Sequence, residues 1–408
     1  MLIKRNKSLI LYSLLLFVIS AIYGLLLRWN FAFPTKIISY KNLLQGHSHV
    51  AFLGWGYLAL IGILLCLFIT KEKQKNNIYN ITIITIIITI FLMLISFIAS
   101  GYKVFSIALL SIFGVVSYVL SFRLLKDISG ISTSHKLIRF GVYYYLISSL
   151  ATWFLAFVII TQGKTELYYN TVYFYLHFLY NGFFVFVLFG ILFKILENQE
   201  IIISERLKKN FFIYLNVACI PAYVLSVLWS TNNLAFNSVG FFAAILQLIS
   251  LVILFRILKQ AYVQLQWNYI SKLLLKYSMV AYALKIVAQL ASSLPYFVSK
   301  SLALKPFFII GYLHLFTLAF MSVFILLILN QLKIISFKKL SSKIGIGLFL
   351  LGVLFTELLL FSQGFLILLQ LKAINYYNQL LLAVSFLIVV GLIFIFSSQF
   401  IKQRNIIK

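Results

Sequence analysis

Four of the five histidines in this chain lie in apolar segments, where a metal-binding side chain is unexpected. His47 and His49 open the stretch QGHSHVAFLGWGYLAL, His177 lies in YFYLHFLYNGFF, and His314 lies in IIGYLHLFTLAF. A polar ring in hydrocarbon is costly and usually functional, and neutral imidazole is the commonest metal ligand among side chains. The four residues are therefore candidate ligands, although each one alone is equally well explained as a core histidine hydrogen-bonded to a neighbouring helix.

The depth of these histidines in their segments indicates which group they would bind. His49 lies near the start of its segment, and His177 and His314 lie about two helical turns in, so the three fall within about 10 Å of depth if their segments run in the same direction. Histidines from different helices at one depth can supply the two opposed axial ligands of a b-type haem. A catalytic zinc site would require three ligands, often including a carboxylate, and the carboxylate nearest to this layer is Glu357. We therefore expect haem rather than zinc.

His47 and His49 are two residues apart, which corresponds to a rotation of about 200° around a helix. Only one of them can therefore face a given slot, and the sequence leaves open which one. The fifth histidine, His135, lies in the polar stretch ISTSHKLIRF, where a loop histidine needs no functional explanation. Cys66 and Cys219 lie inside apolar runs and indicate neither a disulfide nor a zinc site.

The composition indicates that the segments carrying these residues cross a membrane. Hydrophobic residues make up 63% of the 408 residues and charged residues 10%, against about 45–50% and about 25% in soluble domains. The expected fold is an all-α polytopic helix bundle that forms a single transmembrane domain over residues 1–408. About twelve membrane helices are expected, near residues 8–28, 47–70, 78–100, 104–123, 139–161, 171–196, 210–229, 235–258, 273–297, 307–330, 344–366 and 378–401.

Basic residues concentrate in alternate loops, and this pattern predicts the orientation of the bundle. Both termini are expected in the cytoplasm of a bacterium, so that the protein lies in the cytoplasmic (inner) membrane with most Lys and Arg on its inner side. That side would attract anionic lipid head groups. The net charge of +27 does not indicate a nucleic-acid partner, because the basic residues lie at the ends of apolar runs rather than on one soluble face.

Small and charged residues inside the apolar segments have two interpretations each. Gly54 and Gly56, beside Trp55, would let a flat macrocycle approach the backbone, but small residues also let two helices pack closely. Lys285 and Glu357 are the obvious charges at depth, and each would cost about 2.5–3.5 kcal/mol at a helix centre if unpaired. We expect these two to pair or to lie near one another.

Histidines in the second, sixth and tenth of twelve expected helices resemble subunit I of the haem-copper oxidase superfamily, which includes nitric oxide reductases. The segments HSHVAFLGWG, YLHFLYNGFF and YLHLF carry this resemblance. It implies that His49 and His314 are the axial ligands of a low-spin haem b, and His47 is the alternative ligand from the second helix. It also implies that His177 matches the sixth-helix residue that binds copper or non-haem iron, which makes it the candidate for a second metal.

Two departures from the family pattern change the expected activity. The family carries an adjacent pair of histidines in its seventh helix, and residues 197–234 contain none. The first of the two tenth-helix histidines is replaced by Tyr312. The resemblance therefore implies an oxidoreductase-like protein with an intact low-spin haem site and an incomplete binuclear centre, suited to electron transfer or to binding or sensing a diatomic gas. A quinol or a cytochrome subunit would be its electron donor, and full oxygen reduction is not expected.

A secondary transporter without a cofactor is the main alternative, because twelve helices with both termini inside is also a common transporter topology. Transporters often contain internal repeats and helices broken near the membrane midplane. We find no repeat between the two halves of the sequence, which disfavours this alternative. An assembly or scaffold subunit without a cofactor is a third interpretation.

Overall fold

The computed structural model describes residues 2–34, 39–231 and 233–400, and every regular element in these ranges is a helix. Among the described residues, eleven helices are long and apolar enough to cross a membrane. The expected helical membrane bundle is therefore confirmed at this level. The expected segment 378–401 corresponds to a helix over Tyr377–Ser398, and its residue 401 lies outside the described residues.

In chain order the elements are α1 (Leu2–Ala32), α2 (Tyr40–His49), η1 (Val50–Tyr57), α3 (Leu58–Phe68), η2 (Lys73–Lys75), α4 (Asn77–Ser100), α5 (Val104–Asp127), α6 (Thr133–Thr161), α7 (Glu166–His177), η3 (Phe178–Phe184), α8 (Val185–Asn198), α9 (Glu205–Cys219), η4 (Pro221–Ser226), η5 (Leu228–Ser230), α10 (Leu234–Gln264), α11 (Tyr269–Ser292), α12 (Pro295–Ala303), α13 (Lys305–His314), η6 (Leu315–Ser322), α14 (Val323–Gln331), α15 (Leu340–Leu368) and α16 (Tyr377–Ser398).

The expected helix at 210–229 is broken, so the count of twelve spans is not confirmed. The α-helical part, α9, has 15 residues and is about 22 Å long, which is shorter than the roughly 30 Å of hydrocarbon in a bilayer. Pro221 cannot donate a backbone hydrogen bond and ends α-helical pairing. The chain continues as the 3₁₀ segment η4, in which the Tyr223 N–H donates to the Ile220 carbonyl at 3.1 Å.

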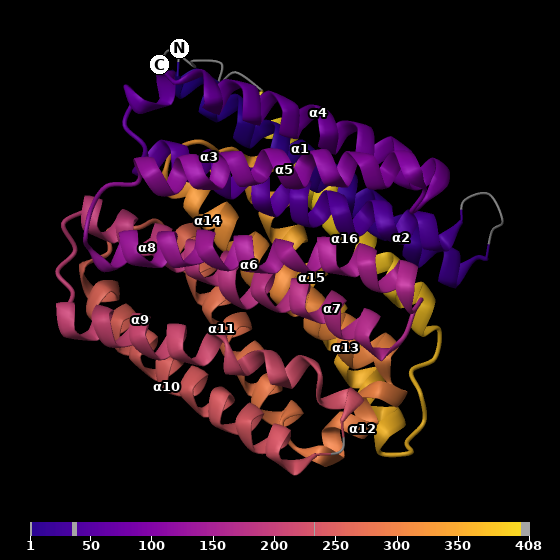
Figure 1. Ribbon diagram of the computed structural model, residues 1–408. Helices are drawn as coiled ribbons and strands as arrows, with labels where there is room; N and C mark the ends of the chain where they lie inside the picture. The colour runs from indigo at the N-terminus through magenta and orange to yellow at the C-terminus, as the bar shows by residue number, and fades with distance from the viewer. Residues whose placement is uncertain (1, 35–38, 232, 401–408) are drawn as a thin grey trace. The chain divides into compact units, whose positions relative to one another are not determined.

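The chain folds into two compact units, a division that no linker in the sequence marks. Unit 1 contains Met1–Cys66, Thr70–Ser117 and Ile325–Lys408, and unit 2 contains Leu67–Ile69 and Tyr118–Phe324. In unit 1, α16 packs against α1 and α15, and in unit 2, α9 and α10 run side by side (Figure 1). The amide of Asn378, at the start of α16, donates to the Phe31 carbonyl near the end of α1 at 3.4 Å. These two helices are therefore antiparallel.

Three candidate spans change from α-helix to π-helix directly after a histidine. The π segments η1, η3 and η6 begin at the residue that follows His49, His177 and His314. The three spans concerned are also the most buried of the eleven. Because π-helical turns are rare and frequently accompany functional sites, their recurrence at the same place singles out these three helices.

The candidate span that comes before each of these three spans in the chain packs against its π segment at equivalent positions. In each case an aromatic side chain of that earlier span, which is α1, α6 or α11, contacts an aromatic side chain of the π segment. The pairs, with the distances between ring centroids, are Phe17–Trp55 (4.5 Å), Tyr145–Phe183 (5.2 Å) and Tyr282–Phe320 (4.9 Å). The first member precedes the histidine by 32 residues in all three (17 to 49, 145 to 177 and 282 to 314).

Small residues recur at one further position of the same pattern, five residues after each histidine. They are Gly54, Gly182 and Ala319. A Cβ at Gly54 would lie 3.1 Å from Leu16 Cδ1 of α1, and a Cβ at Gly182 would lie 2.7 Å from Tyr144 Cγ of α6. The chain thus repeats in thirds, each built on a helix that packs closely on a histidine-bearing helix. A comparison of the two halves of the sequence does not detect this arrangement.

Candidate functional site

The His47 imidazole is held in one tautomer by the neighbouring helix α1. Its Nδ1 lies 2.8 Å from the Ser20 carbonyl oxygen. A carbonyl can only accept, so Nδ1 carries the proton and Nε2 carries the lone pair. Among the described residues, Nε2 has no hydrogen-bond partner. Fixing of one ring nitrogen by a carbonyl, so that the other can bind a metal, is the usual arrangement of a histidine ligand.

One face of α1 supplies three residues beside this ring. Ser20, Gly24 and Arg28 are spaced four residues apart, so they lie on one side of the helix. A Cβ at Gly24 would lie 3.1 Å from Cε1 of His47, which means that the glycine leaves room for the ring. Arg28 acts electrostatically on the His47 imidazole. Its half-buried guanidinium makes no hydrogen bond or ion pair with another described residue.

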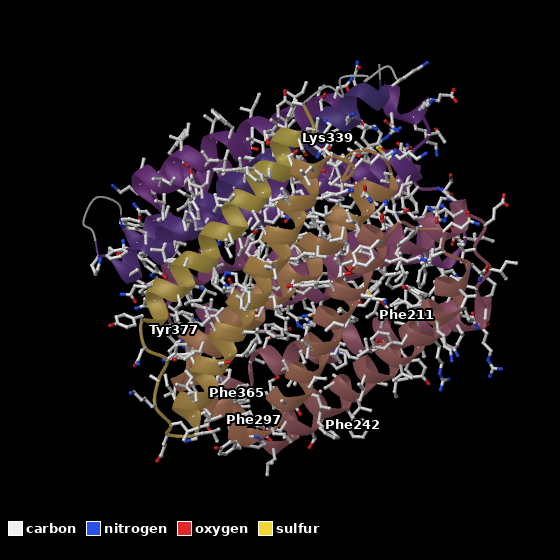
Figure 2. All side chains as sticks on the ribbon, turned by 180° about the vertical axis from the view of Figure 1, so that it is seen from behind. Phe211, Phe242, Phe297, Lys339, Phe365 and Tyr377 are labelled. Atoms are coloured by element: carbon white, nitrogen blue, oxygen red, sulfur yellow. The ribbon has the colours of Figure 1, made fainter. Side chains whose placement is uncertain are left out.

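Polar side chains from three other helices of unit 1 surround Arg28. Glu357 of α15, Tyr377 of α16 and Tyr40 of α2 all interact electrostatically with its guanidinium. Figure 2 shows Tyr377 at the opposite end of the α15–α16 pair from Lys339, which precedes α15. The cluster, which we call the Arg28 cluster (Arg28, Glu357, Tyr40 and Tyr377), therefore lies toward the end of unit 1 at which α1 ends and α16 begins.

His49 faces away from α1 and toward α4, as the rotation of about 200° between the two histidines requires. Its Nδ1–H donates to the Gln45 carbonyl at 2.8 Å, and the Tyr102 hydroxyl donates to its Nε2 at 3.1 Å. The ring stacks on Phe97, with 4.3 Å between the centroids. Gly101, with a φ of +64°, makes the turn that brings Tyr102 to the ring. Both nitrogens of His49 are thus engaged, whereas His47 keeps one available.

His177 stabilises the break in α9. Its Nε2–H donates to the Cys219 carbonyl at 2.8 Å. This carbonyl would accept from the N–H of Tyr223 in a continuous α-helix, but that N–H bonds to Ile220 instead. His177 therefore satisfies one of the carbonyls left over at the helix end. Because Asn181 Nδ2 also donates to Nδ1 at 3.2 Å, His177 would have to give up a hydrogen bond in order to bind a metal.

Lys285 has a neutral partner within unit 2. Its ammonium, on a side chain only 2% exposed, donates to Asn181 Oδ1 and lies 5.5 Å from the centroid of the Tyr282 ring. Asn181 thus links Lys285 to His177. We expected Glu357 to be the neighbour of Lys285. Glu357 belongs to unit 1, and the charged side chain that interacts with its carboxyl group is Arg28.

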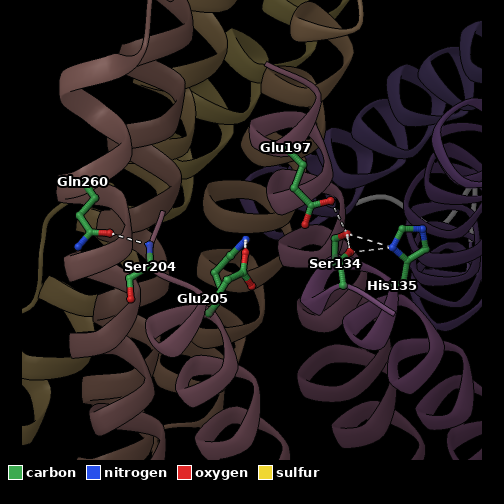
Figure 3. Close-up of polar contacts among 8 residues, drawn as sticks. Ser134, His135, Glu197, Ser204, Glu205 and Gln260 are labelled. Carbon is green, nitrogen blue, oxygen red and sulfur yellow. Dashed lines mark hydrogen bonds and ion pairs between the residues drawn. The ribbon is translucent and has the colours of Figure 1, made fainter. Parts of the chain in front are cut away.

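His314 is half-buried at the end of α13. Tyr312 lies two residues before it, which is the position that His47 occupies relative to His49 in the first third of the chain. His135, which Figure 3 shows beside Ser134, lies in the first turn of α6 rather than in a loop. Its Nδ1 is 2.8 Å from the Ser132 hydroxyl. Ser134 beside it donates to Glu197 at 2.9 Å.

The glycine and tryptophan of the LGWG motif serve helix packing. Gly54 contacts Leu16, and Trp55 is 1% exposed and stacks on Phe17. Of the two interpretations open for Gly54, close packing is therefore the one that the contacts favour. Cys66 and Cys219 are both free cysteines.

Comparisons with models of known protein families and with curated proteins found no match. The functional interpretation therefore rests on the residues themselves. Within the described ranges, no group of three or more His, Cys, Asp or Glu side chains gathers at one point. A haem needs only one or two such ligands from the protein.

Sequence reasoning missed the residues of α1 that position His47. A signal was available, because Ser20, Gly24 and Arg28 interrupt an apolar run at helical spacing. Their relation to His47 depends on how α1 and α2 pack, which the sequence of either helix alone does not specify. Asn181 was missed for the same reason, since a single amide in an apolar helix has no distinctive spacing.

Proposed function

We propose that this chain is a haem b-binding membrane protein that resembles subunit I of the haem-copper oxidases, and that His47 of unit 1 is an axial ligand. The observation that carries the proposal is the His47 ring itself. Its Nδ1 is committed to the Ser20 carbonyl at 2.8 Å, so that its Nε2 presents a lone pair with no hydrogen-bond donor among the described residues. Of the two histidines that open the second span, His47 is the better candidate, because Tyr102 already occupies Nε2 of His49.

The surroundings of His47 fit a haem in one further respect. Arg28, two turns beyond Ser20 on the same face of α1, offers a guanidinium that forms no ion pair with a described carboxylate. An unpaired cation that is removed from water is costly even when it is half-buried, and the propionates of a haem are anions that would compensate it. The residues present therefore suit a haem, which His47 would hold and whose propionate charge Arg28 would compensate.

The resemblance also names His314, a residue of unit 2, as a haem ligand, and this assignment remains a proposal of its own. Haem would supply one-electron chemistry, and with it electron transfer or the sensing of a diatomic gas. Ser20 would keep the His47 ring in the ligating tautomer, and Arg28 would balance the charge of the propionates. A quinol or a cytochrome subunit remains the proposed electron donor, and the bacterial cytoplasmic membrane the proposed location.

The test of this proposal is the absorption spectrum of the protein purified in mild detergent. We expect a sharp b-type band in the reduced-minus-oxidised spectrum, because two imidazole ligands give a low-spin haem. The band should disappear in His314→Ala and persist in His135→Ala, a histidine held by Ser132 outside the proposed site. A colourless wild-type protein that is folded and monodisperse would contradict haem binding and would favour the transporter.

A further inference from the structure

Glu357 is the one carboxyl group that the described spans hold well inside their length. The chain has seven acidic residues in total. The other six lie at the ends of candidate spans or outside them: Glu72, Asp127, Glu166, Glu197, Glu200 and Glu205. The side chain of Glu357 is 8% exposed, and neither of its carboxyl oxygens has a hydrogen-bond partner among the described residues.

The groups that face Glu357 do not satisfy an ionised carboxylate. Arg28 of α1 is the charged side chain that acts on it, yet the ion pairs among the described residues are Arg123–Asp127 and Lys208–Glu205. The other titratable groups around Arg28 are the phenols of Tyr40 and Tyr377 and the imidazole of His47, which come from α2 and α16. None of these forms a hydrogen bond with Glu357.

An ionised carboxylate without a hydrogen-bond donor is strongly disfavoured in an apolar interior, and such groups take up a proton instead. We propose that Glu357 is a proton-binding site of unit 1. It is a neutral carboxylic acid in the resting protein, and Arg28 is the cation toward which it ionises when the proton leaves. Acidic residues inside membrane segments usually mark the path of a proton or an ion, and Glu357 is such a residue. The proposal does not depend on haem.

A hydrophobic carbodiimide tests this proposal directly, because it partitions into membranes and reacts with protonated carboxyl groups. The acid proton passes to a carbodiimide nitrogen while a carboxyl oxygen bonds to the central carbon, which gives an O-acylisourea. This adduct rearranges to a stable N-acylurea of the same composition, so the modified peptide gains the whole mass of dicyclohexylcarbodiimide. Mass spectrometry of the digested full-length protein then locates the modified residue.

We expect dicyclohexylcarbodiimide to modify Glu357 at neutral pH, and a water-soluble carbodiimide to modify the exposed Glu166 while it leaves Glu357 unmodified. The Glu357→Gln variant should lose the hydrophobic label, and the control Glu166→Gln should retain it. Arg28→Gln should be labelled at least as fast as the wild type, because the cation that favours the carboxylate is absent. Absence of label at Glu357 in the folded wild-type protein, or equal labelling of Glu357 by the water-soluble reagent, would overturn the proposal.

The same experiment separates this site from the haem. His47→Ala, which should be free of haem, is expected to keep the label on Glu357. Labelling in that variant together with an absent haem band in the wild type would leave the proton site standing and would reject only the haem proposal.

Discussion

An alanine at position 182 should lower the melting temperature of the purified protein more than an alanine at the equivalent position 54. The new Cβ of Gly182→Ala would lie 2.7 Å from Cγ of Tyr144, a group close to the α6 backbone that cannot turn aside. Overpacking of this kind costs about 1–3 kcal/mol, and we expect the upper end because the clash involves the stem of the Tyr144 side chain. Thermal unfolding in detergent, followed by gel filtration of the remaining monodisperse fraction, measures the effect.

Gly54→Ala is the matched control. Its Cβ would meet Leu16 Cδ1 at 3.1 Å, the far end of a flexible side chain, and Leu16 Cβ at 3.3 Å, both much longer than the 2.7 Å contact at position 182. Alanine is favoured over glycine in a helix by about 0.8–1.0 kcal/mol, so we expect this variant to be close to the wild type in stability. The third equivalent position, Ala319, already carries the methyl group. Equal melting temperatures for Gly182→Ala and Gly54→Ala would contradict the close packing of η3 on α6.

Leucine in place of Asn181 should be among the most destabilising substitutions in unit 2. The variant leaves the buried Lys285 ammonium without its acceptor and His177 Nδ1 without its donor. Loss of a hydrogen bond to a charged group typically costs about 1.5–3 kcal/mol. The free energy of unfolding, or the melting temperature where unfolding is irreversible, should fall accordingly.

A double-mutant cycle identifies the source of that loss. Lys285→Met removes the charge and fills a similar volume, so Asn181→Leu combined with Lys285→Met should recover much of the stability lost in Asn181→Leu alone. None of these substitutions changes His177 or Cys219, whose hydrogen bond we expect to be retained. A double variant whose loss equals the sum of the two single losses would show that the Lys285–Asn181 contact carries no coupling energy.

The spans were predictable because hydrocarbon thickness and backbone hydrogen bonding leave few alternatives for an apolar run of about twenty residues. Residues 210–229 are the exception. They are apolar enough to be predicted as one membrane helix, but Pro221 removes the backbone donor that a continuous α-helix needs at that point. The break could not be predicted from Pro221 alone, because the carbonyl acceptor that it leaves over is satisfied by His177, which is 42 residues away in the sequence.

The sequence predicted that His47 and His49 face different neighbours, but it did not predict which of the two keeps an available ring nitrogen. Helical geometry requires the two rings to face different neighbours, and they do, one toward α1 and the other toward α4. Which ring keeps an available nitrogen depends on Ser20 and Tyr102, each on a different segment. Spacing within one segment cannot supply that information.

The repeat in thirds left a signal in the sequence that a comparison of halves could not detect. His49, His177 and His314 each follow an aromatic residue by 32 positions and precede a small residue by five, so the same spacing occurs three times.

The Lys285–Asn181 contact, in contrast, has no sequence signal of its own. Charge pairing favoured Glu357 as the partner of Lys285, whereas the buried ammonium takes a neutral amide that α11 and η3 bring together.

The haem content of His47→Ala and His49→Ala, measured per mole of purified monodisperse protein, tests the central claim most directly. The hydrogen bonds of the two rings predict that His47→Ala loses nearly all of its haem, because the lone pair held ready by Ser20 is gone. They predict that His49→Ala retains most of it, because that ring is engaged by Gln45 and Tyr102. Full haem content in His47→Ala, or loss confined to His49→Ala, would contradict the account.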